Sequence, residues 1–574
     1  MKLALLCGLL VCSAIETTAL PTDTTEQSNS TGPIVNTRNG SYSGIHNSVY
    51  NQDLFLGVPY AQPPVGSLRF APPRSLNATW AGYRAATELG PSCVGYGEDT
   101  EYGAHNYTSE DCLFVNIVRP AGKPVSALPV AVFIHGGGWE TGSSSNGWYN
   151  MSFLVERSVQ LGQPIVGVSL NYRLAGWGWL YSAEIVKEGS TNVGLRDQRL
   201  ALHWIQENIA SFGGDPSRVT IFGESAGSVS VGRHILAYNG RNDNLFHGAI
   251  GQSGSPAGIG GWNPNIEQLS VATANISESV CPDAIDKLAC LRAADFEALN
   301  NAINATLSLP FAGPLYGPVV DGDIVAREPV KQLLDGAVVK VPYILGTNSD
   351  EASYYAGYGI NTDQDLKEAL MTNMGMNETQ ALALMARYPY YSDAEATSAS
   401  PEVSNEQLNT TLGLQFKRAN TIATDIFMGA PTRFAAQLWH AQNLSKIYIY
   451  NANTTISVGG RWYGAAHGFE LPYTFYNLNG TGWEGDRVPF FAGNPFMGRP
   501  QPYRDLAAVM SGMWVGFFNT GIPYYKNQPV PQWPEYKGAN SSIMIFDAQP
   551  AFLNTRLGKE PREDKRDFVM SQIF

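Results

Sequence analysis

The sequence contains no run of basic residues and, beyond its N-terminus, no uninterrupted apolar run long enough to span a bilayer. Its formal net charge is -13. Nucleic acids and anionic membranes attract proteins through clustered lysine and arginine, so this charge balance argues against both as partners. The missing apolar span likewise argues against integral membrane association.

The chain also lacks internal repeats, charge blocks and Pro/Ser-rich linkers after residue 40. A length of 574 residues often means several domains, but without a boundary signal we expect 33–574 to form a single domain with long insertions. Residues 1–19 combine an early lysine, an apolar core and small residues, as a cleaved signal peptide does. Residues 20–32 are polar and are expected to form a flexible tail. We therefore expect a secreted, extracellular protein.

Cysteine is scarce, and two of the six cysteines, Cys7 and Cys12, leave with the expected signal peptide. The four that remain are Cys93, Cys112, Cys281 and Cys290. None has metal-ligand spacing, and an even set in an oxidising compartment predicts two disulfides. Three pairings are possible, and the two nearest-neighbour pairs are favoured because they close short loops at low entropic cost.

Motifs for asparagine-linked glycosylation are frequent along the chain. They begin at Asn29, Asn39, Asn77, Asn106, Asn150, Asn275, Asn304, Asn377, Asn409, Asn443, Asn453, Asn479 and Asn540. In a chain that enters the secretory path, many of these sites are expected to carry N-glycans and therefore to mark the surface.

The most informative stretch is Gly-Glu-Ser-Ala-Gly at 223–227, where a short apolar run stops abruptly. Residues 219–222 suit a buried strand and residues 226–236 suit a helix. A serine at such a corner projects into solvent, and the helix N-terminus places N–H groups beside its hydroxyl. Because the chain has 59 glycines, the pattern could also arise by chance around a passive serine. The choice depends on whether the chain supplies a base, an acid and oxyanion donors.

Further segments predict the sheet to which this corner belongs. Continuous apolar runs occupy 128–134, 165–171, 248–251, 341–345 and 447–450, and helical patterns occupy 152–160 and 195–212. Residues 53–73 suit a strand followed by a proline-punctuated loop, and 109–118 suit an alternating strand, which together look like an antiparallel edge. Apolar runs without alternation suit strands that are covered on both faces. The alternation of strands and helices predicts an α/β fold with a large, mostly parallel sheet, helices on both faces and an antiparallel edge.

In such a sheet, functional groups gather in loops beyond the carboxyl ends of the strands. The strand at 128–134 is followed by three consecutive glycines, whose unhindered backbone can turn its N–H groups toward an oxyanion. The strand at 341–345 is followed by Asp350 and Glu351, and position alone leaves the choice of acid open. Of eight histidines, only His467 lies in a small-residue loop downstream of both the serine and the acids, which favours it as the general base.

These segments resemble the type-B carboxylesterase/lipase family of the α/β-hydrolase fold, which includes cholinesterases and fungal lipases. The resemblance covers nearly the whole chain after about residue 33 and is closest to secreted fungal carboxylesterases and lipases. It is carried by FLGVPYAQPPVGSLRF, SEDCLFVNI, IHGGGW, NYRLAGWGWL, GESAGSVSVG, GQSGSP, NSDE and GAAHGFELPY.

The resemblance implies a role for each candidate residue. Ser225 matches the nucleophile, Glu351 the acid and His467 the base, in the family's chain order. The backbone amides that match the oxyanion hole are those of Gly137, Gly138 and Ala226. The disulfides implied are Cys93 with Cys112 and Cys281 with Cys290. The expected activity is hydrolysis of a small-molecule ester through an acyl-enzyme, which needs no metal or cofactor.

Two departures from the family bear on the substrate. Cholinesterases carry a tryptophan ten residues before the cysteine of the SEDC-type motif, whereas this chain has Tyr102, so a choline-directed enzyme is not expected. The fungal lipases carry a long amphipathic lid between the first two cysteines, but here the segment 94–111 is only 18 residues and is acidic and Gly-rich. We therefore expect short-acyl or soluble esters as substrates, with Trp139 lining the acyl pocket.

Two alternatives stay open from the sequence. A lipase, or a hydrolase of sterol or phenolic esters, would share this machinery and differ in the volume of its pocket. A catalytically silent adhesion or binding protein on the same fold usually loses catalytic residues, and none is missing here. The sequence does not indicate the oligomeric state.

Overall fold

The structure is a computed structural model that describes residues 32–97, 107–122, 126–258, 265–307, 315–389, 408–458, 461–483, 493–525 and 530–573. The expected signal peptide at 1–19, the tail up to residue 31, Tyr102 and part of the 94–111 segment lie outside the described residues.

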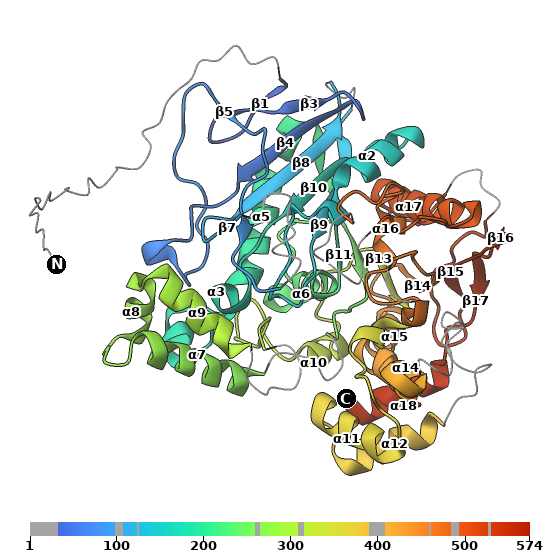
Figure 1. Ribbon diagram of the computed structural model, residues 1–574. Helices are drawn as coiled ribbons and strands as arrows, with labels where there is room; N and C mark the ends of the chain where they lie inside the picture. Colours follow the sequence, from blue (N-terminus) through green and yellow to red (C-terminus); the bar gives the residue numbers. More distant parts are fainter. Residues whose placement is uncertain are drawn as a thin grey trace, which may run out of the picture.

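A 12-stranded sheet crosses the described part of the chain (Figure 1). From one edge to the other its strands are β16 (Phe552–Leu553), β15 (Ile543–Gln549), β14 (Ile447–Asn453), β13 (Tyr343–Asn348), β12 (Gly248–Gln252), β11 (Gly214–Glu224), β9 (Leu128–Ile134), β10 (Val166–Leu170), β8 (Phe114–Pro120), β4 (Gln52–Pro59) and β3 (Ile45–Asn47), with β17 (Arg556–Gly558) paired to β15. Neighbours from β10 to β15 run parallel, while β8, β4 and β3 at one edge and β16 and β17 at the other pair antiparallel. The predicted α/β fold, with its antiparallel edge, is confirmed.

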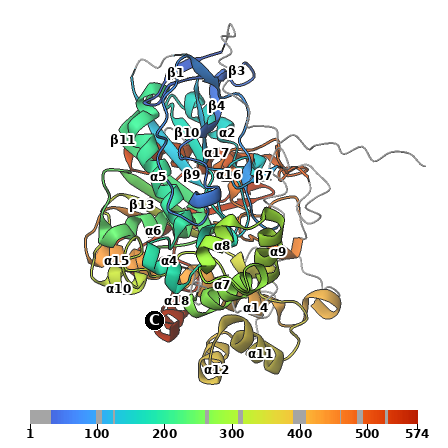
Figure 2. The same cartoon turned by 90° about the vertical axis from the view of Figure 1, so that its left-hand side faces the viewer.

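Helices cover both faces of this sheet, as Figures 1 and 2 show from two directions. One face packs against α2 (Met151–Gln160), α16 (Leu471–Thr474) and α17 (Gln501–Thr520), and the other against α5 (Val193–Asn208), α6 (Ala226–Gly240) and α15 (Ala430–Ala441). The sequence of β9 does not alternate between apolar and polar residues because both of its faces are buried. Val130, Val132 and Ile134 belong to one apolar core, whereas Ala131 and Phe133 belong to the other, and all five are fully buried.

The remaining elements lie in excursions from the sheet or at its ends. The helices are α3 (Ala175–Trp179), α4 (Ala183–Glu188), α7 (Ile266–Val280), α8 (Lys287–Ala293), α9 (Phe296–Thr306), α10 (Pro329–Leu334), α11 (Asp363–Met374), α12 (Glu378–Arg387), α14 (Phe416–Thr424) and α18 (Glu563–Ile573). The small sheets are β1 (Ile34–Asn36), β2 (Ser41–Ser43) and β5 (Tyr83–Ala85), and β6 (Ser92–Cys93) with β7 (Thr108–Ser109). Within the described residues, no helix combines the length and apolar character needed to cross a membrane.

Two predicted boundaries are wrong. The strand expected over 109–118 is divided into β7, which ends at Ser109, and β8, which begins at Phe114. The helix expected over 195–212 ends at Asn208 and continues as a 3-10 turn to Phe212. The turn expected over 213–216 is confined to Gly213, which has φ +85°, because β11 already begins at Gly214. Gly214 pairs with the start of β9, and a register shift before Val219 absorbs the intervening residues.

Both expected disulfides are present. Cys93 and Cys112 are joined near the β6–β7 ribbon, and Cys281 and Cys290 join the end of α7 to α8. The nearest-neighbour pairing is therefore confirmed.

Candidate active site

Ser225 occupies the corner between β11 and α6. Its backbone, at φ 58° and ψ -125°, lies in a region that L-residues rarely adopt, so the turn is strained. Glycines at positions 223 and 227 permit the turn, because a Cβ on Gly223 would lie 2.5 Å from the Gly227 backbone. A Cβ on Gly227 would collide with the carbonyl of Ile134 at the end of β9. The Gly-x-Ser-x-Gly spacing thus follows from the close approach of strand and helix.

The glycine loop after β9 lies directly beside this serine. A Cβ added to Gly136 would come within 3.0 Å of the Ser225 Cβ, so the loop and the corner are in close contact. Gly137 and Gly138 both have positive φ, at +96° and +63°, and a Cβ at Gly138 would meet nothing within 4 Å. Ala226 is the first residue of α6, so its amide is at the N-terminus of that helix. Of the three residues expected to supply oxyanion donors, Ala226 therefore adjoins Ser225, and Gly137 and Gly138 directly follow the loop residue that contacts it.

Glu351 and His467 come together from the ends of adjacent strands, β13 and β14. The Nδ1 atom of His467 lies 2.6 Å from Oε2 of Glu351, and the Glu351 side chain is 1% exposed. The other oxygen of Glu351 accepts hydrogen bonds from the Ser253 hydroxyl and the Asn348 backbone N–H, each 2.6 Å long. These donors fix the carboxylate, which in turn fixes the ring and directs Nε2 away from the acid.

A second carboxylate, that of Glu224, lies on the other side of the imidazole. Its Oε1 is 3.2 Å from Nε2 of His467, and its chain neighbour is Ser225. Burial alone would lower the pKa of His467, but the charges of Glu224, Glu351 and Glu470, with the hydrogen bond that His467 donates to Glu351, raise it to about 9. The surrounding carboxylates therefore stabilise an imidazolium ion.

Glu470 is the third carboxylate of the cluster around His467. It is fully buried and accepts hydrogen bonds from Asn348 Nδ2 at 2.6 Å and Gln252 Nε2 at 3.0 Å. Burial, followed by the charge of Glu351, raises the pKa of Glu470 above its ordinary value. Gln252 also accepts the indole N–H of Trp514 on α17 at 3.0 Å, which links the site to the opposite core.

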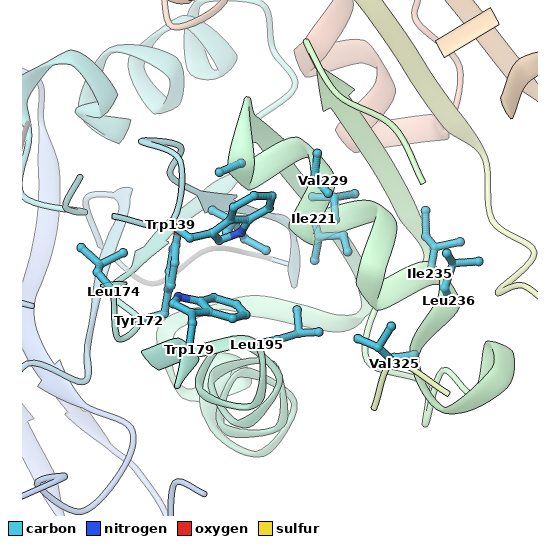
Figure 3. Close-up of a cluster of buried hydrophobic side chains, with 14 of the residues drawn as sticks. Trp139, Tyr172, Leu174, Trp179, Leu195, Ile221, Val229, Ile235, Leu236 and Val325 are labelled. Carbon is cyan, nitrogen blue, oxygen red and sulfur yellow. The ribbon is translucent and has the colours of Figure 1, made fainter. Parts of the chain in front are cut away.

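Trp139 and His135, which flank the glycine loop, are both buried. Trp139 is 1% exposed, donates its indole N–H to Ser230 at 3.2 Å and packs edge-on against Trp179. Figure 3 shows it within the apolar cluster under α6. His135 stacks on Tyr172 with ring centroids 4.4 Å apart, and burial lowers its pKa to about 4, which favours a neutral, structural imidazole.

A strained serine at a strand–helix corner, with an acid and a histidine following later strands of a parallel sheet, is the arrangement of α/β-hydrolase enzymes. The chain belongs to the carboxylesterase family, whose sequence profile matches residues 31–569. It is accordingly an ester hydrolase.

Individual relatives agree with this assignment. Lipase 4 of Diutina rugosa is 37% identical over 469 residues, covering 76% of this chain and 79% of the lipase. A secreted triacylglycerol lipase of Gibberella zeae is 31% identical over 546 residues, covering 90% and 87%. The crystal structure of Aspergillus niger EstA superposes with a TM-score of 0.78 at 27% identity, covering 94% of this chain and 98% of EstA.

Sequence reasoning missed Glu224, Ser253, Asn348 and Glu470 as parts of the site. Glu224 and Glu470 lie within the same motifs as the serine and the histidine, and this closeness in sequence could have indicated that they belong to the site. Ser253 reaches Glu351, and the Asn348 side chain reaches Glu470, through contacts between different strand ends, which no spacing along the chain reveals.

Proposed function

We propose that this protein hydrolyses carboxylic esters through a Ser225–His467–Glu351 triad and an acyl-enzyme intermediate. The observation that carries the proposal is the 2.6 Å contact between His467 Nδ1 and Glu351 Oε2 beside the strained serine corner. Since Nδ1 is committed to the acid, Nε2 is the atom that exchanges a proton with the serine hydroxyl.

The reaction runs in two halves. Neutral His467 takes the proton of Ser225 as its Oγ attacks the ester carbonyl, and the backbone amides of Gly137, Gly138 and Ala226 stabilise the oxyanion. The same proton is then given to the departing alcohol, which leaves Ser225 acylated. Water, activated by His467, releases the acid and restores the serine. Each oxyanion donor is worth about 3 kcal/mol of barrier, and Glu351 stabilises the imidazolium that forms in both halves.

We further propose that the substrates are short-acyl or soluble esters. The support is the segment 94–111, whose acidic and Gly-rich composition offers little apolar surface for a lipid interface. The test is a series of p-nitrophenyl esters from acetyl to palmitoyl, together with tributyrin on both sides of its solubility limit. Highest kcat/KM at short chains and no jump at the limit are expected, whereas a steep jump would favour a lipase, as the names of the relatives suggest.

A second candidate is a hydrolase of esters that carry an aromatic group. Its support is Tyr355, which is 43% exposed and lies edge-on to His467 with ring centroids 5.9 Å apart, so that an aromatic substrate would meet it beside the base. Comparison of phenyl acetate with ethyl acetate, in the wild type and in Tyr355→Leu, separates the two candidates. A preference for the phenyl ester that disappears in the variant would favour the aromatic substrate class.

Residues 1–19 are proposed to direct secretion, with 33–574 as a single catalytic domain that carries N-glycans. The two disulfides support an oxidising compartment. Trp139 is proposed as one wall of the acyl pocket because it adjoins the glycine loop, and Trp139→Phe is then expected to move the chain-length optimum in the ester series.

A further inference from the structure

Asp350 directly precedes Glu351, the proposed triad acid, and makes hydrogen bonds of its own. It is completely buried at the end of β13, and both of its carboxylate oxygens are engaged. Oδ2 accepts the backbone N–H of Ala465 at 3.0 Å, and Oδ1 accepts Nδ2 of Asn420 on α14 at 3.2 Å. The backbone N–H of Asp350 also donates to the carbonyl of Ala465 at 3.0 Å. Asp350 therefore holds Ala465 by two separate hydrogen bonds.

Ala465 is two residues before His467, so these bonds act on the loop that carries the base. The next residue, Ala466, is held by Asn348, whose Nδ2 donates to the Ala466 carbonyl at 2.8 Å. Room for the Asp350 carboxylate exists because position 464 is glycine. A Cβ there would collide with Oδ2, and Gly464 has φ +65°. The acid turn and the histidine loop are thus joined at consecutive residues.

The third component is helix α14, which closes a circuit of hydrogen bonds around Glu351. Thr424 accepts the backbone N–H of Ala352 at 3.1 Å and donates to Oδ1 of Asn420 at 3.2 Å. Asn420 in turn donates to Asp350, which completes the circuit. Glu351 lies between Asp350 and Ala352, so the residues on both sides of the acid are tied to one helix.

We propose that Asp350 is a positioning residue that holds the His467 loop against the Glu351 turn in the geometry that proton transfer needs. This inference rests on the proposed triad and adds a buried carboxylate that touches neither substrate nor reacting atoms. The contacts with Ala465 and Asn420 use its two oxygens as acceptors of N–H groups, so a side chain that keeps an acceptor should preserve most of the effect.

Two substitutions separate this role from general stabilisation. Asp350→Ala removes both acceptors and leaves the histidine loop unanchored, so kcat per active site should fall about 100-fold with little change in KM. Asp350→Asn keeps an oxygen for the Ala465 N–H and loses only the acceptor that faces Asn420. This variant should remain within about tenfold of the wild type.

Asp53→Ala is the matched control. Asp53 is also buried; it accepts the backbone N–H of Gly122 at 3.2 Å, is ion-paired with Arg119 at 3.1 Å and lies 3.2 Å from His46 Nδ1. It lies on β4, next to the edge strand β3 and on the other side of the sheet from β13. The control should lose comparable stability in urea unfolding while keeping its kcat per active site.

A spectroscopic measurement tests the same point without relying on turnover. The Nδ1 proton between His467 and Glu351 should give a low-field proton NMR resonance that Glu351→Gln removes. The resonance should be lost or broadened in Asp350→Ala and retained in Asp350→Asn and Asp53→Ala. An unmoved resonance in Asp350→Ala, or equal kcat losses in Asp350→Ala and Asp53→Ala, would overturn the positioning role. A wild-type enzyme without esterase activity would instead count against the proposed function, and the resonance would still decide the role of Asp350.

Discussion

The carboxylate of Glu224 lies 3.2 Å from Nε2 of His467, on the side of the ring opposite Glu351. The imidazole is therefore held between two carboxylates, one on each nitrogen. In the proposed triad Glu351 orients the base, whereas Glu224 stabilises its protonated form, and only the neutral form can accept the serine proton. The balance between these two effects sets the pH at which the enzyme works.

Replacement of Glu224 by glutamine is expected to move the acid limb of the pH profile to lower pH. The Glu224 charge favours the imidazolium, so its loss lowers the pKa of His467 from about 9, by roughly one to three units. Wild-type kcat/KM should rise as the pH rises through the pKa of His467, and the variant should reach its plateau earlier. The measurement is kcat/KM for a soluble ester from pH 5 to 10.

Glu207→Gln is the control for this experiment, because Glu207 pairs with Arg38 at the surface. Its acid limb should coincide with that of the wild type. A profile unchanged in Glu224→Gln, or moved to higher pH, would contradict the assignment of His467 as the titrating base.

Glu351→Gln is expected to lower kcat by about 10⁴-fold while leaving KM near its wild-type value. The amide would present an NH2 group either to His467 Nδ1 or to the donors Ser253 and Asn348, so the ring loses its orientation. Steady-state kinetics with a p-nitrophenyl ester measures the loss. A decrease smaller than that of Asp350→Asn would show that the acid has been assigned to the wrong residue.

Removal of the Cys281–Cys290 disulfide should reduce stability without reducing activity. The bond closes a loop of 9 residues between α7 and α8, which predicts a decrease of about 2.5 kcal/mol in the free energy of unfolding. The double variant Cys281→Ser/Cys290→Ser, compared with the wild type by urea unfolding and ester hydrolysis, tests this. A large drop in kcat under conditions in which the variant is fully folded would show that the α7–α8 segment contributes to catalysis.

The sequence predicted the sheet well because its strands are buried on both faces and therefore appear as continuous apolar runs. The run at 128–134 coincides with β9, and the run at 447–450 lies within the longer β14. The start of β11 was misplaced because its first residues are polar and proline-containing, and only pairing with β9 makes them a strand.

For the proposed site, the sequence indicated Ser225, Glu351 and His467 but not Glu224, Ser253 or Glu470, which contact them or adjoin them. Ser225 and His467 lie in short local patterns, the Gly-x-Ser-x-Gly corner and the small-residue loop, which can be recognised in the sequence itself. The contact of Glu224 with His467, and of Asp350 with Ala465, joins loops that are distant along the chain. Such contacts depend on how the strand ends meet in space, which periodicity along one segment does not encode.

Covalent labelling by a fluorophosphonate is the most direct test of Ser225 as the nucleophile. One modification per wild-type chain is expected, found by mass spectrometry on the peptide that contains Ser225. Ser225→Ala should take up no label and hydrolyse no p-nitrophenyl ester, while its unfolding transition matches that of the wild type. A folded Ser225→Ala variant that is still labelled, or that still hydrolyses the ester, would show that another residue is the nucleophile.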